Sequence, residues 1–313
     1  MKKNTWDAVI AGGGPAGLSA ALMLGRARRR TLVIDAGSGR NRFAERMHGV
    51  LGNDGIPPGD ILARGRAEIA EYGVELLTDT VGEVASFSDG LRLRTAGGLT
   101  LSSRSLIVAT GLSDELLDIP GLAERWGTTV LHCPYCHGWE VRDRRLGVLT
   151  ASPLGVHQAE LIRQWSDRVT VFTAFLNPLT PEAERRLRAR GVELEPEPVT
   201  AVLGEVPGIS TVLLRDGREV PLDAIFTAGA PLPHDRFLAP LGLTRAETPF
   251  GSFLAVDDTG KTSDERVWAV GNVVNPAANV AMSIGAGALT ASAVNGALVG
   301  WDFDAAAGRH DEE

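Results

Sequence analysis

The chain has 313 residues, and at about 100–200 residues per domain this length predicts two domains with sizeable cores. Hydrophobic residues make up 44 % and charged residues 22 %, proportions that argue against a disordered or fibrous chain. The formal net charge of −8 argues against nucleic acid or an anionic membrane surface as the main partner, so we expect a small or neutral substrate.

The N-terminal segment predicts a βαβ unit. Residues 6–11 are typical of a short buried strand, the glycine-rich segment 12–17 follows, and apolar residues then recur at helical spacing. A second apolar run at 31–34 predicts the next strand. The basic cluster at 26–30 lies at the expected end of the helix, where we expect it to be solvated.

Three glycines in this unit match the GxGxxG pattern of dinucleotide-binding proteins. Gly12 would allow the tight turn, Gly14 would let the backbone approach a pyrophosphate, and Gly17 would let the helix pack on the strand. A pyrophosphate would lie at the N-terminus of the helix, where free N–H groups and the helix dipole favour negative charge. Asp35 follows the second strand and could accept hydrogen bonds from a ribose.

The pattern of strands and helices continues along the chain. The charged segment 58–72 predicts a helix, short alternating strands follow it, and 105–111 is a buried strand that runs into a small-residue turn. The segment 267–272 repeats this form. The uncharged stretch 279–300 is long enough to span a bilayer, but its asparagines, serines and threonines favour a helix buried inside a soluble domain.

A second alternation of strands and helices lies between these two parts. It predicts strands at 146–150 and 168–172, helices at 155–166 and 181–190, and further strands up to 225–228. The fold class is therefore α/β, with one α/β domain inserted into another.

The two cysteines of the chain, Cys133 and Cys136, form a CxxC pair flanked by His132 and His137. Haem attachment normally needs export, and the N-terminus does not match a secretory signal, so we expect a cytoplasmic protein. Zinc usually takes two separated ligand pairs, and we expect no metal. A structural disulfide across so short a loop would remove little chain entropy. Redox catalysis is the favoured interpretation, because CxxC lowers a thiol pKa and keeps the pair reversible.

Four motifs together resemble the low-molecular-weight thioredoxin reductase family of flavoproteins. They are the glycine-rich segment 12–17, Ala109-Thr110-Gly111, the CxxC pair and Gly271-Asn272 before the last helix. The resemblance implies two Rossmann-like three-layer domains and a homodimer. An FAD-binding domain would comprise 1–114 and 233–313, and a redox-cysteine domain of the NADPH-binding type would comprise 115–232.

The resemblance also implies which residues contact FAD. Asn272 stands where the family usually has Asp, and Asn279-Val280-Ala281 stands where it usually has Arg-Gln-Ala. Neither departure forbids flavin, since an asparagine and a backbone N–H can still form hydrogen bonds. The expected contacts are Gly12, Gly14, Pro15, Ala16, Gly17, Asp35, Arg42, Thr110, Gly111, Gly271, Asn272, Val280 and Ala281, with Arg42 equally compatible with a place on the surface.

The second nucleotide-binding motif of the family is degenerate in this chain. Side chains of 150–155 occupy the turn where the family has glycines, and Thr173-Ala174-Phe175 replaces the cation cluster that binds the 2′-phosphate of NADPH. A phosphate without a cation loses charge-assisted hydrogen bonds of about 1.5–3 kcal/mol each. The sequence therefore predicts that the NADPH site is lost.

A degenerate NADPH site and the segment 132–140, HCPYCHGWE, resemble the flavin-dependent dithiol oxidases of the gliotoxin and holomycin type. This resemblance implies that Cys133 exchanges with a small-molecule dithiol, that Cys136 faces the flavin, and that dioxygen accepts the electrons to give hydrogen peroxide. His137 would be the general base, whereas His132 and His48 are weaker candidates. Tyr135 and Trp139 would be packing residues or walls of a pocket.

Two other functions remain open. One is a thioredoxin reductase-like disulfide reductase that uses NAD(P)H or another electron donor. The other is a flavoprotein scaffold or redox sensor whose cysteines switch a partner.

Overall fold

The computed structural model describes residues 5–152 and 154–311, which form two compact units. Unit 1 is drawn from Met1–Arg40, Pro58–Ser113 and Pro233–Glu313, and unit 2 from Asn41–Pro57 and Asp114–Leu232. The sequence prediction placed 41–57 in the first domain, whereas its contacts group it with unit 2. This loop has no strand or helix periodicity, so only its tertiary contacts assign it.

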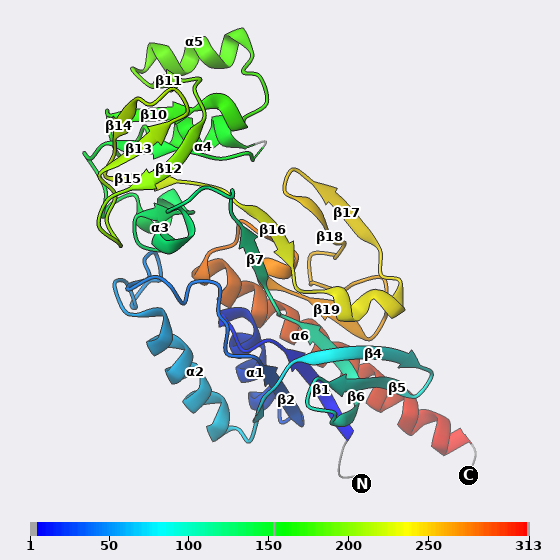
Figure 1. The fold of residues 1–313 in the computed structure, drawn as a ribbon. Helices are drawn as coiled ribbons and strands as arrows, with labels where there is room; N and C mark the ends of the chain where they lie inside the picture. The colour runs from blue at the N-terminus through cyan, green and yellow to red at the C-terminus, as the bar shows by residue number, and fades with distance from the viewer. Residues whose placement is uncertain (1–4, 153, 312–313) are drawn as a thin grey trace. The chain divides into compact units, whose positions relative to one another are not determined.

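A mostly parallel sheet with strand order β3-β2-β1-β6-β5-β4 is the centre of unit 1, with β19 beside β6 (Figure 1). The pairs among β1, β2, β3, β6 and β19 are parallel, and β5 is antiparallel to β4 and β6. The strands are β1 (Thr5–Ala11), β2 (Thr31–Asp35), β3 (Glu75–Thr78), β4 (Val81–Phe87), β5 (Gly90–Thr95), β6 (Thr100–Val108) and β19 (Val267–Ala269).

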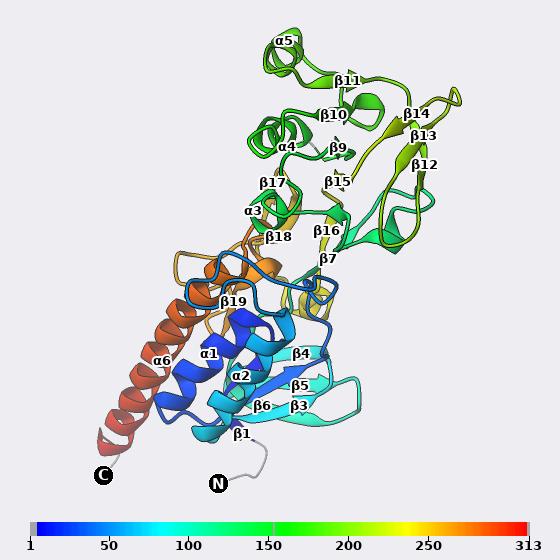
Figure 2. The same cartoon turned by 90° about the vertical axis from the view of Figure 1, so that its left-hand side faces the viewer.

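Three helices cover one face of this sheet, as Figure 2 shows: α1 (Pro15–Arg26), α2 (Pro58–Glu71) and α6 (Val280–Asp311). Because side chains alternate along a strand, Ala8 and Ile10 of β1 pack toward the helices, and Val9 and Ala11 pack into a second core on the opposite face. The 3₁₀ helix Arg236–Leu241 and the hairpin of β17 (Arg245–Thr248) and β18 (Gly251–Leu254) contribute to that opposite side.

Helix α6 is buried along one side only. Ala291, Val294 and Leu298 are buried in the core shared with α1, whereas Met282 and Leu289 are exposed. By length and composition α6 could cross a membrane. The expected burial of this helix is thus confirmed for the side that packs on α1 and is wrong for the other side.

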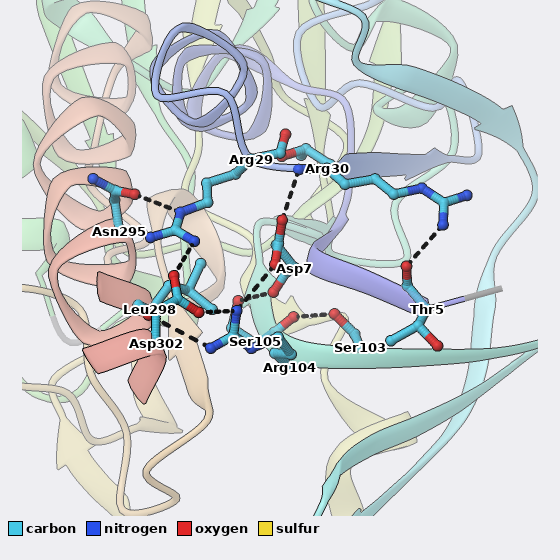
Figure 3. Close-up of polar contacts among 11 residues, drawn as sticks. Thr5, Asp7, Arg29, Arg30, Ser103, Arg104, Ser105, Asn295, Leu298 and Asp302 are labelled. Carbon is cyan, nitrogen blue, oxygen red and sulfur yellow. Dashed lines mark hydrogen bonds and ion pairs between the residues drawn. The ribbon is translucent and has the colours of Figure 1, made fainter. Parts of the chain in front are cut away.

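The second half of α6 is tied to the sheet by the polar network in Figure 3. Arg29 donates to Asn295 Oδ1 at 2.8 Å and pairs with Asp302 at 2.7 Å. Arg104 pairs with Asp302 at 2.7 Å and with Asp7 at 3.2 Å. The prediction that the basic cluster at the end of α1 is solvated is therefore wrong for Arg29, whose side chain is only 13 % exposed.

A parallel sheet with strand order β11-β10-β9-β15-β8 is the centre of unit 2. Helices α4 (Gly155–Ile162) and α5 (Pro181–Ala189) lie on one face, and an antiparallel sheet lies on the other (Figure 2). The parallel strands are β8 (Val130–Leu131), β9 (Leu146–Val148), β10 (Val169–Phe172), β11 (Glu193–Glu195) and β15 (Ala224–Phe226); the antiparallel strands are β12 (Val199–Leu203), β13 (Thr211–Leu214) and β14 (Glu219–Pro221).

The predicted α/β class is confirmed. Each parallel sheet has helices on one face and β-structure on the other, which completes three layers in each unit. The chain passes between the units through β7 (Leu112–Glu115) and β16 (Ala230–Pro233), which pair with each other.

Candidate functional site

The CxxC pair lies at the start of the short helix α3 (Pro134–His137) in unit 2. Cys133 is the N-cap in an extended conformation, and Pro134 occupies the first helical position, where its fixed φ favours a helix start. Gly138 follows the helix and packs on Trp165, since a Cβ at Gly138 would lie 2.7 Å from that indole ring. The local sequence therefore fixes the start of α3, whereas Gly138 is required by the close approach of Trp165.

Cys133 and Cys136 form a disulfide, with their Cα atoms 5.2 Å apart. Both residues are partly exposed. The Cys136 N–H also donates to Cys133 Sγ at 3.2 Å. A backbone N–H that points at a sulfur stabilises negative charge there, so after reduction this contact favours a thiolate at Cys133.

His137 is the residue directly after the disulfide, and it is half-buried. Burial lowers the pKa of His137 below 6.5, with His48 adding to that shift and Glu140 opposing it. The imidazole is therefore neutral at pH 7 and can accept a proton.

The loop 41–57 brings a second histidine to this region of unit 2. His48 Nδ1 lies 3.4 Å from Asp54 Oδ2, and His48 Nε2 lies 3.4 Å from Glu140 Oε1. The sequence made His48 a weaker candidate for the base, and its contact with Asp54 lies within the same loop. Its contact with Glu140, three residues after His137, was not predicted, because no local pattern links 48 to 140.

Helix α4 supports the other side of the motif. Gln158 is 9 % exposed, and its Nε2 donates to the carbonyl of His132 at 3.2 Å. His132 also contacts the ring of Trp126, with the ring centroids 6.5 Å apart. Gln158 thus holds the backbone directly before Cys133, a role that the sequence analysis missed.

The three fingerprint glycines lie between the end of β1 and the first turn of α1 in unit 1, with Gly14 as the N-cap and Gly17 inside the helix. Gly12 has φ +105°, and a Cβ there would lie 2.3 Å from the carbonyl oxygen of Ala109. A Cβ at Gly17 would lie 1.9 Å from the Gly12 oxygen, whereas a Cβ at Gly14 would meet no described atom within 4 Å. With Pro15 at the first position of α1, the turn is tight on the protein side and open at Gly14, which fits a bound pyrophosphate.

Asp35 stands at the end of β2 and already has two partners. Its Oδ1 accepts the Gly13 N–H at 3.1 Å, and its Oδ2 pairs with Arg66 of α2 at 3.1 Å. A carboxylate has about four acceptor positions, so it can still accept from a ribose. Arg66 was missed by the sequence analysis, since α2 is far from Asp35 along the chain.

Asn272 supports the turn before α6. Its Nδ2 donates to the carbonyls of Asn275 at 3.0 Å and Ala278 at 2.9 Å. Arg40 donates to the carbonyl of Pro276 in the same turn at 2.9 Å. An aspartate could not donate these bonds, so the departure from the family residue has a structural use.

The first turn of α6 contains the predicted contacts Val280 and Ala281. Asn279 caps this turn, because its Oδ1 accepts the Met282 N–H at 2.9 Å. Gly271 has φ +77°, and a Cβ there would lie 3.0 Å from that of Ala16, so the turn before α6 lies close to the start of α1. Two of the predicted cofactor segments thus meet within unit 1.

Thr110 and Gly111 follow β6 in unit 1. Thr110 Oγ1 donates to the carbonyl of His234 at 2.7 Å, and Ser113 Oγ forms a hydrogen bond with His234 Nε2 at 2.9 Å.

Arg42 lies in unit 2, where its guanidinium stacks 4.0 Å from the ring centroid of Phe43. A cofactor role for Arg42 stays a prediction.

The turn after β9, where the family has its second nucleotide motif, is filled by the protein itself. Thr150 Oγ1 donates to the Ala228 carbonyl at 3.0 Å and accepts the Ser152 N–H at 3.0 Å. A Cβ at Gly155 would lie 2.3 Å from a methyl group of Leu176. Leu176 therefore covers the start of α4, while Pro153, which also departs from the family pattern, lies outside the described residues.

A comparison with protein families gives a match over residues 6–294 to the family described as pyridine nucleotide-disulphide oxidoreductase. The chain belongs to this family. Its thioredoxin reductase-like members are flavoproteins that bind FAD, so the predicted enzyme class and cofactor are confirmed.

Individual relatives of this pyridine nucleotide-disulphide oxidoreductase carry the name thioredoxin reductase. Thioredoxin reductase sirT of Leptosphaeria maculans is 31 % identical over 96 % of the chain and 97 % of that protein. Thioredoxin reductase tcpT of Claviceps purpurea (strain 20.1) is 40 % identical over 54 % of the chain and 56 % of that protein. The crystal structure of HlmI has a TM-score of 0.93 and 42 % identity, and the match covers 98 % of the chain and 97 % of HlmI. The resemblance stated from the motifs is thus confirmed.

Proposed function

We propose that the chain is an FAD-dependent dithiol oxidase, which forms a disulfide in a small-molecule dithiol and passes the electrons to dioxygen to give hydrogen peroxide. The observation that carries this proposal is the combination of a CxxC disulfide on α3 with a turn after β9 that Leu176 and Thr150 fill. A disulfide oxidoreductase with a closed turn at the position of its second nucleotide motif is consistent with a thiol substrate as the electron donor.

The residues of unit 1 fit FAD. The open position at Gly14 lies at the N-terminus of α1, where backbone N–H groups favour a pyrophosphate. Asp35 would hold the ribose, and the capped first turn of α6 would offer N–H groups of Val280 and Ala281. The other expected contacts, from Pro15 to Asn272, belong to the same proposal.

The first step is thiol–disulfide exchange at Cys133. A substrate thiolate attacks Cys133 Sγ, the Cys133–Cys136 bond breaks, and Cys136 leaves as a thiolate. The substrate is then joined to Cys133 by a mixed disulfide. Partial exposure of the Cys133 side chain makes this attack feasible.

The second step closes the product. His137, neutral at pH 7 because burial lowers its pKa, removes the proton of the second substrate thiol. That thiolate attacks the substrate sulfur of the mixed disulfide and expels Cys133 as a thiolate, which the Cys136 N–H stabilises. The product is a disulfide, and both enzyme cysteines are reduced.

When bound, FAD would supply the two-electron oxidation that restores the Cys133–Cys136 disulfide, with dioxygen as the final electron acceptor. Two protons from the dithiol then account for the two hydrogens of hydrogen peroxide. Each turnover converts one dithiol and one dioxygen into one disulfide and one peroxide.

Anaerobic mixing tests the proposed electron donor. The holoenzyme is mixed with excess NADPH or with dithiothreitol, and the visible absorbance of the flavin is followed. We expect dithiothreitol to bleach the flavin and NADPH to leave it oxidised. Rapid bleaching by NADPH would contradict the proposal and support the disulfide reductase instead.

We also propose a cytoplasmic homodimer. Supporting the dimer, the exposed side of α6 carries Met282, Leu289, Val299 and Phe303, and exposed apolar groups on one helix side favour association. Light scattering on the holoenzyme tests this state. A monomer at micromolar concentration would contradict it.

A further inference from the structure

Two aromatic side chains of the redox motif are unusually exposed. Tyr135 lies between the two cysteines and is 72 % exposed, and Trp139 lies three residues after Cys136 and is 65 % exposed. Of the two roles expected for them, packing or the walls of a pocket, this exposure favours the second. Exposed aromatic rings beside a reactive group are available to stack on a ligand.

Both rings are held in defined orientations. Tyr135 packs edge-on against Trp165, with ring centroids 5.7 Å apart and an interplanar angle of 89°. The Arg142 guanidinium lies 4.0 Å from the ring centroid of Trp139, and its Nη1 donates to the Trp139 carbonyl at 2.6 Å. One face of Trp139 is thus covered by a cation, and this cation also contacts the Trp139 backbone.

The charges around Trp139 are of both signs. Arg142 stacks on the ring, and Glu140 follows it in the chain and contacts His48. A strongly charged ligand would be attracted by one group and repelled by the other, whereas a neutral planar group would gain from stacking on either ring.

We propose that Tyr135 and Trp139 determine substrate specificity by binding a planar, uncharged aromatic or heteroaromatic part of the dithiol. This inference rests on the proposed dithiol oxidase function. Tyr135 lies within the CxxC loop, so a molecule whose sulfur attacks Cys133 must come close to that ring. Two rings are too small a patch for a protein partner, whose interface needs about 1,000 Å² in total.

The specificity ratio tests this inference. The ratio of kcat/KM for 1,2-benzenedimethanethiol to kcat/KM for dithiothreitol is measured for the wild type and for Trp139→Ala and Tyr135→Ala. We expect the ratio to fall about tenfold in each alanine variant, the scale of one good ring contact. Changes in the redox potential of the disulfide affect both substrates and cancel in the ratio.

Two further variants serve as controls. Trp139→Phe keeps an aromatic ring and should retain most of the ratio. Phe87→Ala removes an exposed ring from β4 in unit 1, where Arg92 also stacks on it with its guanidinium 4.7 Å from the ring centroid. It should leave the ratio unchanged. An unchanged ratio in Trp139→Ala and Tyr135→Ala, or an equal fall in Phe87→Ala, would overturn the inference.

A binding measurement separates this inference from the proposed function. The bis(methylthioether) of 1,2-benzenedimethanethiol cannot react, and calorimetry measures its binding to the holoenzyme. We expect binding that Trp139→Ala weakens about tenfold. Equal binding to both proteins would overturn the inference even if dithiols are oxidised, and loss of binding in the variant would support it even if no dithiol is turned over.

Discussion

His137 combines a position next to the redox disulfide with a side chain that is neutral at pH 7. Burial holds the pKa of His137 below 6.5, so the imidazole can accept a proton at neutral pH and loses this capacity as the pH falls through that lowered pKa. A thiol has an ordinary pKa of about 8.5, so near pH 7 a substrate thiol would need the proposed base, and above about pH 9 the thiol ionises without a base.

We therefore predict a pH-dependent defect for His137→Ala. The variant should lose about 10²-fold in kcat near pH 7 and should approach the wild-type rate above pH 9. A pH–rate profile with dithiothreitol checks this, and flavin content serves as the control for folding. A defect of the same size at every pH would show that His137 is not the base.

The contact between the Cys136 N–H and Cys133 Sγ leads to a second prediction at this scale. In Cys136→Ser the remaining Cys133 thiol should have a pKa below about 8.5, and it should form a mixed disulfide with an activated disulfide at neutral pH. In Cys133→Ser the remaining Cys136 thiol should react more slowly. Alkylation rates between pH 5 and 10 give both pKa values, and a lower pKa for Cys136 would reverse the assigned roles.

The sequence predicted residues whose role depends on their neighbours in the chain. Gly12 and Gly17 are such residues, because their spacing in the sequence brings the Gly12 oxygen close to the position of a Cβ at Gly17. Gln158 could not be recognised in this way, and neither could the contact of His48 with Glu140, since both reach the redox motif from other segments. A single sequence contains no signal for such long-range contacts.

At the scale of elements, α6 depends on a network of charges at its second half. Asp302 pairs with Arg29 and Arg104, and its hydrogen bond from Arg29 lowers the pKa of Asp302. The folded state is therefore stabilised above the ordinary carboxyl pKa of about 4, and this contribution is lost as the pH falls below that value.

We predict that Asp302→Ala lowers the free energy of unfolding by about 1–2 kcal/mol, because the mostly buried Arg29 loses its charged partner. The melting temperature should fall by about 2–4 °C. Thermal unfolding at pH 7 measures this, with Asp304→Ala, an exposed neighbour in α6, as the control. Equal melting temperatures for the two variants would contradict the role of the network.

Periodic elements were the easiest to predict. The helix expected at 181–190 is α5 (Pro181–Ala189), and the strand expected at 168–172 is β10 (Val169–Phe172). The helix expected at 155–166 ends earlier, at Ile162. The pairing of β7 with β16 was not predicted, because these short strands have no apolar alternation and are separated by more than a hundred residues.

For the whole molecule, the sequence predicted an insertion of one α/β domain in another, because periodic segments and two glycine turns recur in order. The place of the loop 41–57 was not predictable. Its contacts, such as that of His48 with Glu140, group the loop with unit 2. The loop sequence has no periodicity from which such contacts could be predicted.

Oxygen stoichiometry tests the proposed oxidase most directly. The holoenzyme is supplied with dithiothreitol in air, without a nicotinamide nucleotide, while oxygen consumption, thiol loss and peroxide formation are followed together. We predict one oxygen consumed and one hydrogen peroxide formed for each dithiol oxidised, and loss of all three in Cys133→Ser. Dithiol oxidation without oxygen consumption, or turnover that requires NADPH, would contradict it.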